Sequence, residues 1–155
     1  MKSFQGSTVV KLDTSGRLKL PPDVVTDFKS VDPTGKVFLK YMPERMVCIR
    51  PANKAPSEPP SDSAEKDYDD DAETRIRLRQ ISLLSNYDTI SPQGRVTLPQ
   101  SLLELIDVKA GQNVVLVGFG HGYEIWKPET LAEEMRKELE QRHRKYEQTR
   151  DKVTE

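Results

Sequence analysis

KLDTSGRLKLP occupies residues 11–21 of the chain, and a related stretch, TISPQGRVTLP, occupies residues 89–99. The two stretches align at a constant offset of 78 residues, so their glycine, their arginine and their final proline coincide. The apolar residues that follow keep this register, since Val24, Val25 and Phe28 fall on Leu102, Leu103 and Ile106. Self-similarity at a fixed offset is typical of a repeated structural unit. We therefore expect two degenerate copies of one short unit.

Each copy is predicted to be a β-rich unit with one short helix, which makes the fold class mainly β with short helices (α+β). A strand leads to a glycine turn, and the next strand alternates apolar and polar residues with a period of two. A proline ends that strand, a short helix with one apolar stripe follows, and two paired strands close the copy. The predicted strands cover residues 8–13, 17–20, 36–41 and 45–50, and in the second copy residues 86–91, 95–98, 113–117 and 122–126.

The rest of the chain is predicted to form a linker and two further helices. Residues 51–73 are rich in Pro, Ser, Ala and acids, so we expect a flexible linker that folding does not require. Apolar side chains on one helical face predict a connecting helix over residues 73–84, and the spacing of Leu131, Met135 and Leu139 predicts a last helix that opens at Pro128. The expected organisation is a first repeat at 1–50, a linker at 51–73, a connecting helix and second repeat at 74–128, and a C-terminal helix at 129–155.

Charge is distributed unevenly along the chain. The formal net charge is −1, but residues 51–73 contain eight acids against two lysines, which leaves a net charge of +5 on the rest. A basic body is compatible with a polyanionic partner. No apolar run is long enough for a membrane span, so we expect a cytoplasmic protein that does not bind membranes. The single cysteine, Cys48, lies in an apolar run and is expected to be a buried thiol.

The two arginine turns are the candidate functional site. Gly16 and Gly94 are suited to tight turns with positive φ, so each arginine that follows, Arg17 or Arg95, would be held on a rigid hairpin. A guanidinium group can bond two phosphate oxygens or the edge of a guanine. Asp13 lies four residues before Arg17 and can orient it, although the two could also be no more than an ion pair across a turn. Lys11 and Lys19 add nearby positive charge.

The residues of both turns resemble the MraZ family of bacterial regulators. The similarity rests on residues 11–22, on residues 89–100, on the segment from Gly111 to Glu129 with its Glu-Ile-Trp motif, and on the opening Phe4-Gln-Gly6. It spans nearly the whole chain except residues 51–72. The resemblance implies tandem AbrB-like halves that form a swapped-hairpin β-barrel. It also implies a ring-like homo-oligomer that is associated with the nucleoid and binds short promoter repeats of a cell-division and cell-wall gene cluster.

The family motif Asp-x-x-x-Arg maps onto Asp13 and Arg17 in the first copy, and onto Ser91 and Arg95 in the second. The second turn therefore lacks the carboxylate of the family motif. The acidic linker is a further departure from the family pattern. The sequence thus predicts a DNA-binding site at Arg17, Arg95, Asp13, Lys11 and Lys19, in which the first turn is the stronger one.

Catalysis is not expected, because the two histidines, His121 and His143, stand in a glycine-rich turn and late in a charged helix, away from any nucleophile motif. We expect no catalytic residue, no cofactor and no metal. Two other interpretations remain open. One is a structural or protein-interaction module without specific DNA binding. The other, closer to the first interpretation, is an antitoxin of the AbrB type, although these usually carry one copy of the unit per chain.

Overall fold

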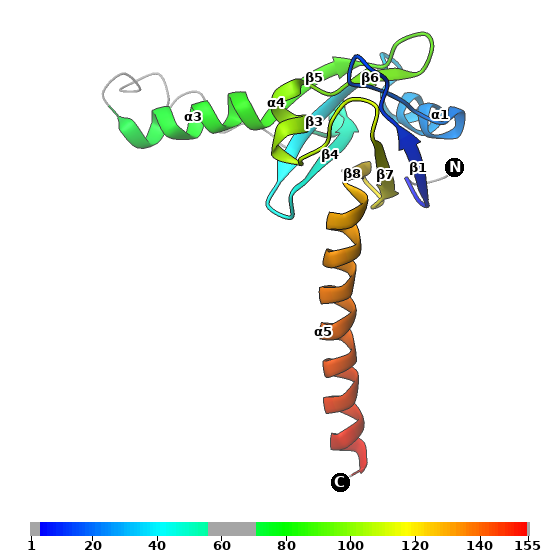
Figure 1. Cartoon of the computed structure of the whole chain (residues 1–155), viewed down its shortest axis with the longest axis vertical. Coiled ribbons are helices and arrows are strands. Elements are labelled where there is room, and N and C mark those ends of the chain that lie inside the picture. The colour runs from blue at the N-terminus through cyan, green and yellow to red at the C-terminus, as the bar shows by residue number, and fades with distance from the viewer. Residues whose placement is uncertain (1–3, 56–70, 155) are drawn as a thin grey trace.

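The computed structural model describes residues 4–55 and 71–154 (Figure 1). The two halves of the chain contain the same elements in the same order. The first half consists of β1 (Ser7–Lys11), β2 (Arg17–Lys19), α1 (Pro22–Val31), β3 (Lys36–Met42) and β4 (Met46–Pro51). The second consists of β5 (Ser85–Thr89), β6 (Arg95–Thr97), α4 (Gln100–Leu105), β7 (Asn113–Gly118) and β8 (Tyr123–Trp126). The expected mainly β architecture with short helices is confirmed.

The strands of the two halves are interleaved in two antiparallel sheets. The larger sheet has the order β1-β7-β8-β4-β3-β5, and the smaller one pairs β2 with β6. The first strand of each half thus joins strands of the other half, with Val9 opposite Val115 and Phe38 opposite Tyr87. Four of the six strand pairings in the described chain join one half to the other. Neither half therefore has a sheet of its own.

One main core lies between these sheets and the two short helices. Leu18 and Val96 face each other across the smaller sheet and are completely buried. The predicted helix stripes also point inward, because Val24 and Phe28 of α1, and their counterparts on and just after α4, are buried. Burying a large apolar side chain contributes about 1.5–3 kcal/mol relative to leaving it exposed. The apolar positions that the repeat shares are therefore the positions that hold the two halves together.

The N-terminal segment crosses the β7–β8 hairpin. The ring of Phe4 contacts those of Phe28 and Tyr123, with ring centroids 5.2 and 5.9 Å apart. The backbone N–H of Gly118 donates to the carbonyl of Gly6 at 2.8 Å. A Cβ atom at Gly118 would lie 2.2 Å from the carbonyl oxygen of Phe4, so only glycine allows this close approach.

The beginning of the predicted linker is ordered, which corrects its first boundary. Pro51 is buried and ends β4, and Ala52–Lys54 form a 3-10 helix, η1. Asn53 fixes η1 to the end of α1, because its side-chain amide donates to the carbonyl of Val31 at 2.8 Å and its backbone N–H donates to Asp32 at 3.3 Å. Residues 56–70, where most of the predicted flexible linker falls, lie outside the described residues.

Two long helices, α3 (Ala72–Leu84) and α5 (Pro128–Thr154), extend away from the sheets in different directions (Figure 1). The Asp71 side chain caps α3 by accepting the N–H of Glu73. The expected helices are present, but the expected apolar face of α3 has no core beneath it, since none of its residues is buried. Within the described residues, no helix has the combined length and apolarity that a membrane span needs.

Candidate nucleic-acid interface

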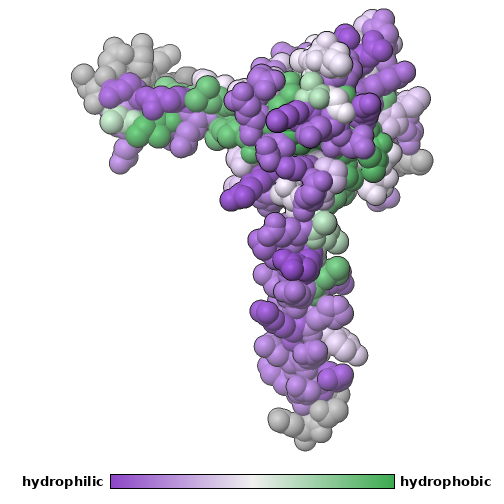
Figure 2. Space-filling model, in the orientation of Figure 1, coloured by the Kyte–Doolittle hydropathy of each residue, from purple (hydrophilic) through white to green (hydrophobic). Residues whose placement is uncertain are grey.

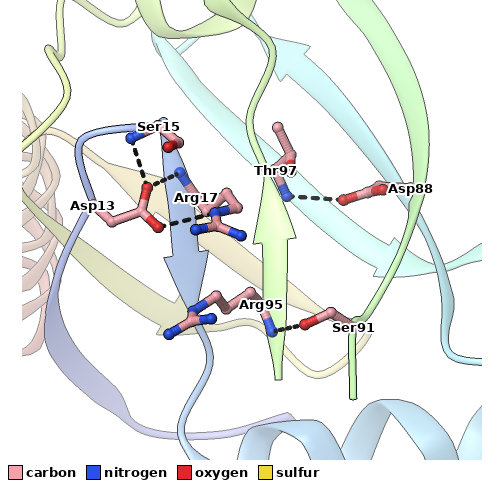
Figure 3. A network of polar contacts seen from close by, with 7 residues as sticks. All are labelled: Asp13, Ser15, Arg17, Asp88, Ser91, Arg95 and Thr97. Carbon is pink, nitrogen blue, oxygen red and sulfur yellow. Dashed lines mark hydrogen bonds and ion pairs between the residues drawn. The ribbon is translucent and has the colours of Figure 1, made fainter. Parts of the chain in front are cut away.

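The β2–β6 ribbon brings the two arginine turns onto one surface. Its antiparallel register places Arg17 opposite Thr97 and Lys19 opposite Arg95. Because side chains alternate along a strand, these four project from the face opposite the buried Leu18–Val96 pair. Figure 3 shows the guanidinium groups of both arginines on the same side of this ribbon. Three cationic side chains from the two halves therefore share one outward face.

The first turn holds its arginine by both backbone and side chain. Asp13 Oδ1 accepts the N–H groups of Ser15 and Arg17, each at 2.9 Å, and Asp13 Oδ2 accepts Arg17 Nε at 3.0 Å (Figure 3). The Arg17 side chain remains 45% exposed, so the ion pair leaves it open to a partner. The backbone N–H of Arg17 is the largest cause that lowers the pKa of the Asp13 carboxyl below its usual value. The carboxyl is thus ionised at neutral pH and forms an ion pair with the Arg17 guanidinium.

The second turn repeats the backbone geometry without the ion pair. Ser91 Oγ accepts the backbone N–H of Arg95 at 3.0 Å, and the Gly94 N–H donates to the Ser91 carbonyl at 2.8 Å. The first turn has the equivalent bond from Gly16 N–H to the Asp13 carbonyl at 3.1 Å. No described residue accepts a hydrogen bond from the Arg95 guanidinium. Ser91 therefore shapes the turn but leaves the functional end of Arg95 unoriented.

The two glycine turns are joined to each other through the backbone. Leu20 N–H donates to the Gly94 carbonyl at 2.8 Å, and Leu98 N–H donates to the Gly16 carbonyl at 3.1 Å. Both glycines have positive φ, +76° at Gly16 and +79° at Gly94, a conformation that disfavours other residues. The segment that follows β2 thus holds the Gly94 turn, and the segment that follows β6 holds the Gly16 turn. The two arginines are held by a shared scaffold rather than by two independent loops.

Asp88 is a residue of this surface that sequence reasoning missed. Its Oδ2 accepts the backbone N–H of Thr97 at 2.8 Å, which ties β5 to β6 beside the basic face (Figure 3). The repeat carried no signal for it, because the equivalent position in the first half is Val10. The sequence signal that could have indicated it is an acidic residue within the predicted strand 86–91. Its partner, the backbone N–H of Thr97, follows only from the arrangement of the strands.

Lys11 is placed apart from the ribbon. It ends β1 in the larger sheet, opposite Asn113, and lines a hollow of about 440 Å³ together with Lys127 and Glu129. The Lys127 ammonium in that hollow is paired with Asp107 at 2.7 Å. Of the five predicted site residues, the structure therefore brings Arg17, Lys19 and Arg95 onto one face with Asp13 beside them, and leaves Lys11 on the other sheet.

The remaining chemically distinctive side chains lie elsewhere. Cys48 is buried, and burial is the largest cause that raises the pKa of its thiol. His121 lies in the β7–β8 turn against Phe119, and His143 is exposed on α5. Among the described residues, no group of three or more His, Cys, Asp and Glu side chains is arranged to hold a metal ion.

Comparison with known proteins yields two relatives with the same description. The transcriptional regulator MraZ of Oleidesulfovibrio alaskensis is 31% identical over 136 residues, which cover 83% of this chain and 83% of that protein. The transcriptional regulator MraZ of Rhodospirillum rubrum is 28% identical over 134 residues, which cover 84% of this chain and 83% of that protein. No protein-family model matches the chain.

Proposed function

This chain belongs to the MraZ family of transcriptional regulators, and from that membership we propose that it regulates transcription by sequence-specific binding to double-stranded DNA. The observation that carries the proposal is the outward face of the β2–β6 ribbon, where Arg17, Lys19 and Arg95 lie together. The relatives are named as regulators of transcription, and a surface on which cations gather suits such a role better than it suits catalysis. We propose that the protein is not an enzyme.

A two-stranded ribbon such as β2–β6 is an element that proteins use to read DNA. The major groove of B-DNA admits a two-stranded β-ribbon, and an arginine can bond O6 and N7 of guanine at once. Arg17 enters such a contact already oriented by Asp13, which lowers the conformational entropy lost on binding. Lys19 and Arg95 would contact phosphates beside it, and Lys11 would contribute only at the margin.

A single ribbon supplies too few cations for tight binding, so the proposal includes assembly. Phosphate contacts by three or four cations give a weak and salt-sensitive interaction. In a ring-like homo-oligomer, successive ribbons would meet successive short promoter repeats of a cell-division and cell-wall gene cluster, as the family resemblance implies. Linked contacts of this kind can raise avidity by about 10² to 10⁴. The expected location is the cytoplasm, in association with the nucleoid.

A protein-interaction module is the second candidate, and the exposed apolar residues of the two projecting helices favour it. Leu83 of α3 is 56% exposed, and Met135 and Leu139 of α5 are exposed as well. Large apolar side chains that gather on an exposed helix often mark a partner surface. A protein-interaction role is compatible with DNA binding. If the protein does not bind DNA specifically, this role replaces the role of a DNA-binding regulator.

An electrophoretic titration tests the proposal directly. The full chain is titrated against DNA from upstream of its own gene, with the same fragment carrying scrambled repeats as a matched control. Both titrations contain excess nonspecific DNA. We expect the native fragment to remain bound at competitor levels that remove the scrambled one, because specific binding commonly exceeds nonspecific binding by about 10³ or more. Equal loss of both complexes would contradict sequence-specific binding and favour the interaction module.

A further inference from the structure

Helix α5 leaves the body of the protein after its first turn. Leu131 packs against the small apolar cluster of Met46, Cys48 and Trp126. From residue 135 to residue 152 every side chain is exposed. Helices of this kind gain most of their stability from packing one face against a neighbour, and a helix of 27 residues is about 40 Å long. The described part of the chain offers no such neighbour to the outer part of α5.

An apolar face nevertheless continues from Leu131, at the packed end of α5, into the exposed part of the helix. Leu131, Met135, Leu139 and Tyr146 fall on one side of the helix, with Arg142 between the last two. Their spacing of four, four and seven residues is close to the seven-residue pattern of paired helices. Met135, Leu139 and Tyr146 are 43, 44 and 65% exposed. Figure 2 shows apolar side chains along one side of this otherwise hydrophilic helix.

The charges of α5 are segregated along its length. Residues 128–141 contain five acids and two bases, a net charge of −3, whereas residues 142–154 contain five bases and two acids, a net charge of +3 with histidine neutral. Two such helices repel each other when parallel, because like halves are then adjacent. They attract each other when antiparallel, because each acidic half then lies along a basic half. The helix is therefore complementary to itself in one orientation.

We propose that α5 pairs with α5 from a second copy of the chain as an antiparallel two-helix coiled coil. The heptad register places Leu139 opposite Arg142 of the second copy, and Met135 opposite its Tyr146. The aliphatic stem of Arg142 covers Leu139 while its guanidinium reaches water. This contact is distinct from the ribbon face, so it would join two chains, or two assemblies of chains, without occupying the proposed DNA-binding surface.

The same register also pairs the flanking charges. Glu138 lies beside Lys145 of the second copy, and Glu129 lies beside its Arg150. Each pair occurs twice, because an antiparallel pair of identical helices has two-fold symmetry. In the parallel alternative Lys145 would lie beside Arg150 of the second copy, which is repulsive. A different acidic or basic protein could match only one half of α5, whereas a second α5 matches both.

Cysteine cross-linking tests the pairing and its direction. In a Cys48→Ala background, Met135→Cys and Tyr146→Cys variants of different size are mixed and oxidised mildly. Antiparallel pairing brings position 135 next to position 146, within disulfide reach, but leaves like positions about 16 Å apart along the helix. We therefore expect the mixed disulfide to exceed either symmetric disulfide at least fivefold. Gln148→Cys, on the outer side of the helix, is the control and should cross-link weakly with every variant.

The cross-linking outcomes are decisive in either direction. A dominance of symmetric disulfides would show parallel pairing and overturn the proposal. Yields no higher than those of Gln148→Cys would show that this face binds something other than a second α5, or nothing. In both cases the DNA titration of the full chain would be unaffected, so the two proposals fail separately.

A charge exchange supplies a second measurement that does not depend on the apolar face. Glu138→Lys places a cation beside Lys145 of the second copy, and Lys145→Glu places an anion beside its Glu138. We expect either single change to lower the yield of the mixed disulfide by about two- to tenfold, because exposed pairs have modest effects and each occurs twice. The double change restores the attraction and should restore the yield. Unchanged yields in both single variants would contradict the proposed register.

Discussion

Arg17 and Arg95 occupy equivalent places in their turns, yet their guanidinium groups are held differently. Asp13 accepts Arg17 Nε at 3.0 Å, whereas Ser91 bonds only the backbone N–H of Arg95. Both turns have the same hydrogen-bonded backbone, so the difference lies in the one side chain. A preorganised arginine loses less entropy on binding, and we therefore expect the first turn to dominate recognition.

Removing each arginine tests this difference. Losing a base-reading arginine costs about 1–3 kcal/mol per site and relaxes specificity, whereas losing a phosphate contact weakens all sequences alike. Arg17→Ala is therefore expected to reduce the discrimination between promoter and random DNA, and Arg95→Ala to have a milder and less selective effect. Competition titrations at physiological salt measure both. Promoter affinity that is equal for the wild type and Arg17→Ala would contradict the proposed role of Arg17.

Supplying the missing carboxylate is the converse experiment. Ser91→Asp gives the second turn the side chain that Asp13 gives the first, and the backbone N–H of Arg95 already donates to the side-chain oxygen at this position. We expect specific DNA affinity to rise by a few-fold, because the guanidinium loses less freedom on binding. Ser91→Asn is the matched control, since it can bond the backbone but lacks the charge. An equal gain in both variants would show that orientation by charge is not the cause.

Among the elements, the β7–β8 hairpin depends on a close approach of backbones. A Cβ atom at Gly118 would lie 2.2 Å from the Phe4 carbonyl oxygen and 2.7 Å from Gln5 Cα. Gly118→Ala is therefore expected to lower the free energy of unfolding by about 1–3 kcal/mol, because the N-terminal segment must move. Chemical denaturation measures the change. Gly120→Asn is the control, since a Cβ there meets nothing within 4 Å.

The loss in Gly120→Asn should be smaller and should reflect only its positive φ of +93°. If the two variants lose the same stability, the close contact between the N-terminal segment and the hairpin does not matter for folding.

The aromatic cluster beside this hairpin predicts a loss of stability at alkaline pH. Burial, followed by the nearby Asp27 carboxylate, raises the pKa of Tyr123 from 10 to about 12. A raised pKa means that the folded state keeps the proton more tightly, so this contribution is complete below pH 10 and is lost as the pH rises toward 12. Denaturation at pH 9 and pH 11 measures the loss. Tyr123→Phe should show a smaller difference between the two pH values, and an unchanged difference would contradict the assignment.

At the scale of the whole molecule, the strand exchange makes the halves depend on each other. Strand pairs β1–β7, β2–β6, β3–β5 and β4–β8 all cross between them. We expect a chain cut at a protease site inserted within residues 56–70 to stay together and to unfold in one transition, because the cut removes none of these pairings. Gel filtration and thermal unfolding test this, with the uncut insertion variant as the control. Fragments that separate under native conditions would contradict the interdependence.

Several features of the fold and of the site followed from local sequence. The 78-residue repeat predicted the order of the strands and short helices, and the stripes Val24–Phe28 and Leu102–Ile106 predicted which faces are buried. The spacing of Asp13 and Arg17 predicted their ion pair, because four residues around a tight turn bring the two side chains together. These predictions depend only on periodicity and turn geometry, which neighbouring residues determine.

The exchange of strands and the shared basic face were decided by tertiary structure. The residues of a strand such as β5 are the same whether it pairs within its own half or beside β3, because the pattern of side chains along a strand reports burial and does not name the partner. For the same reason, the β2–β6 register that unites Arg17, Lys19 and Arg95, and the bond from Asp88 to Thr97, were not visible along the chain. By itself the sequence determined the two arginine turns, and only long-range pairing in a common core made them one surface.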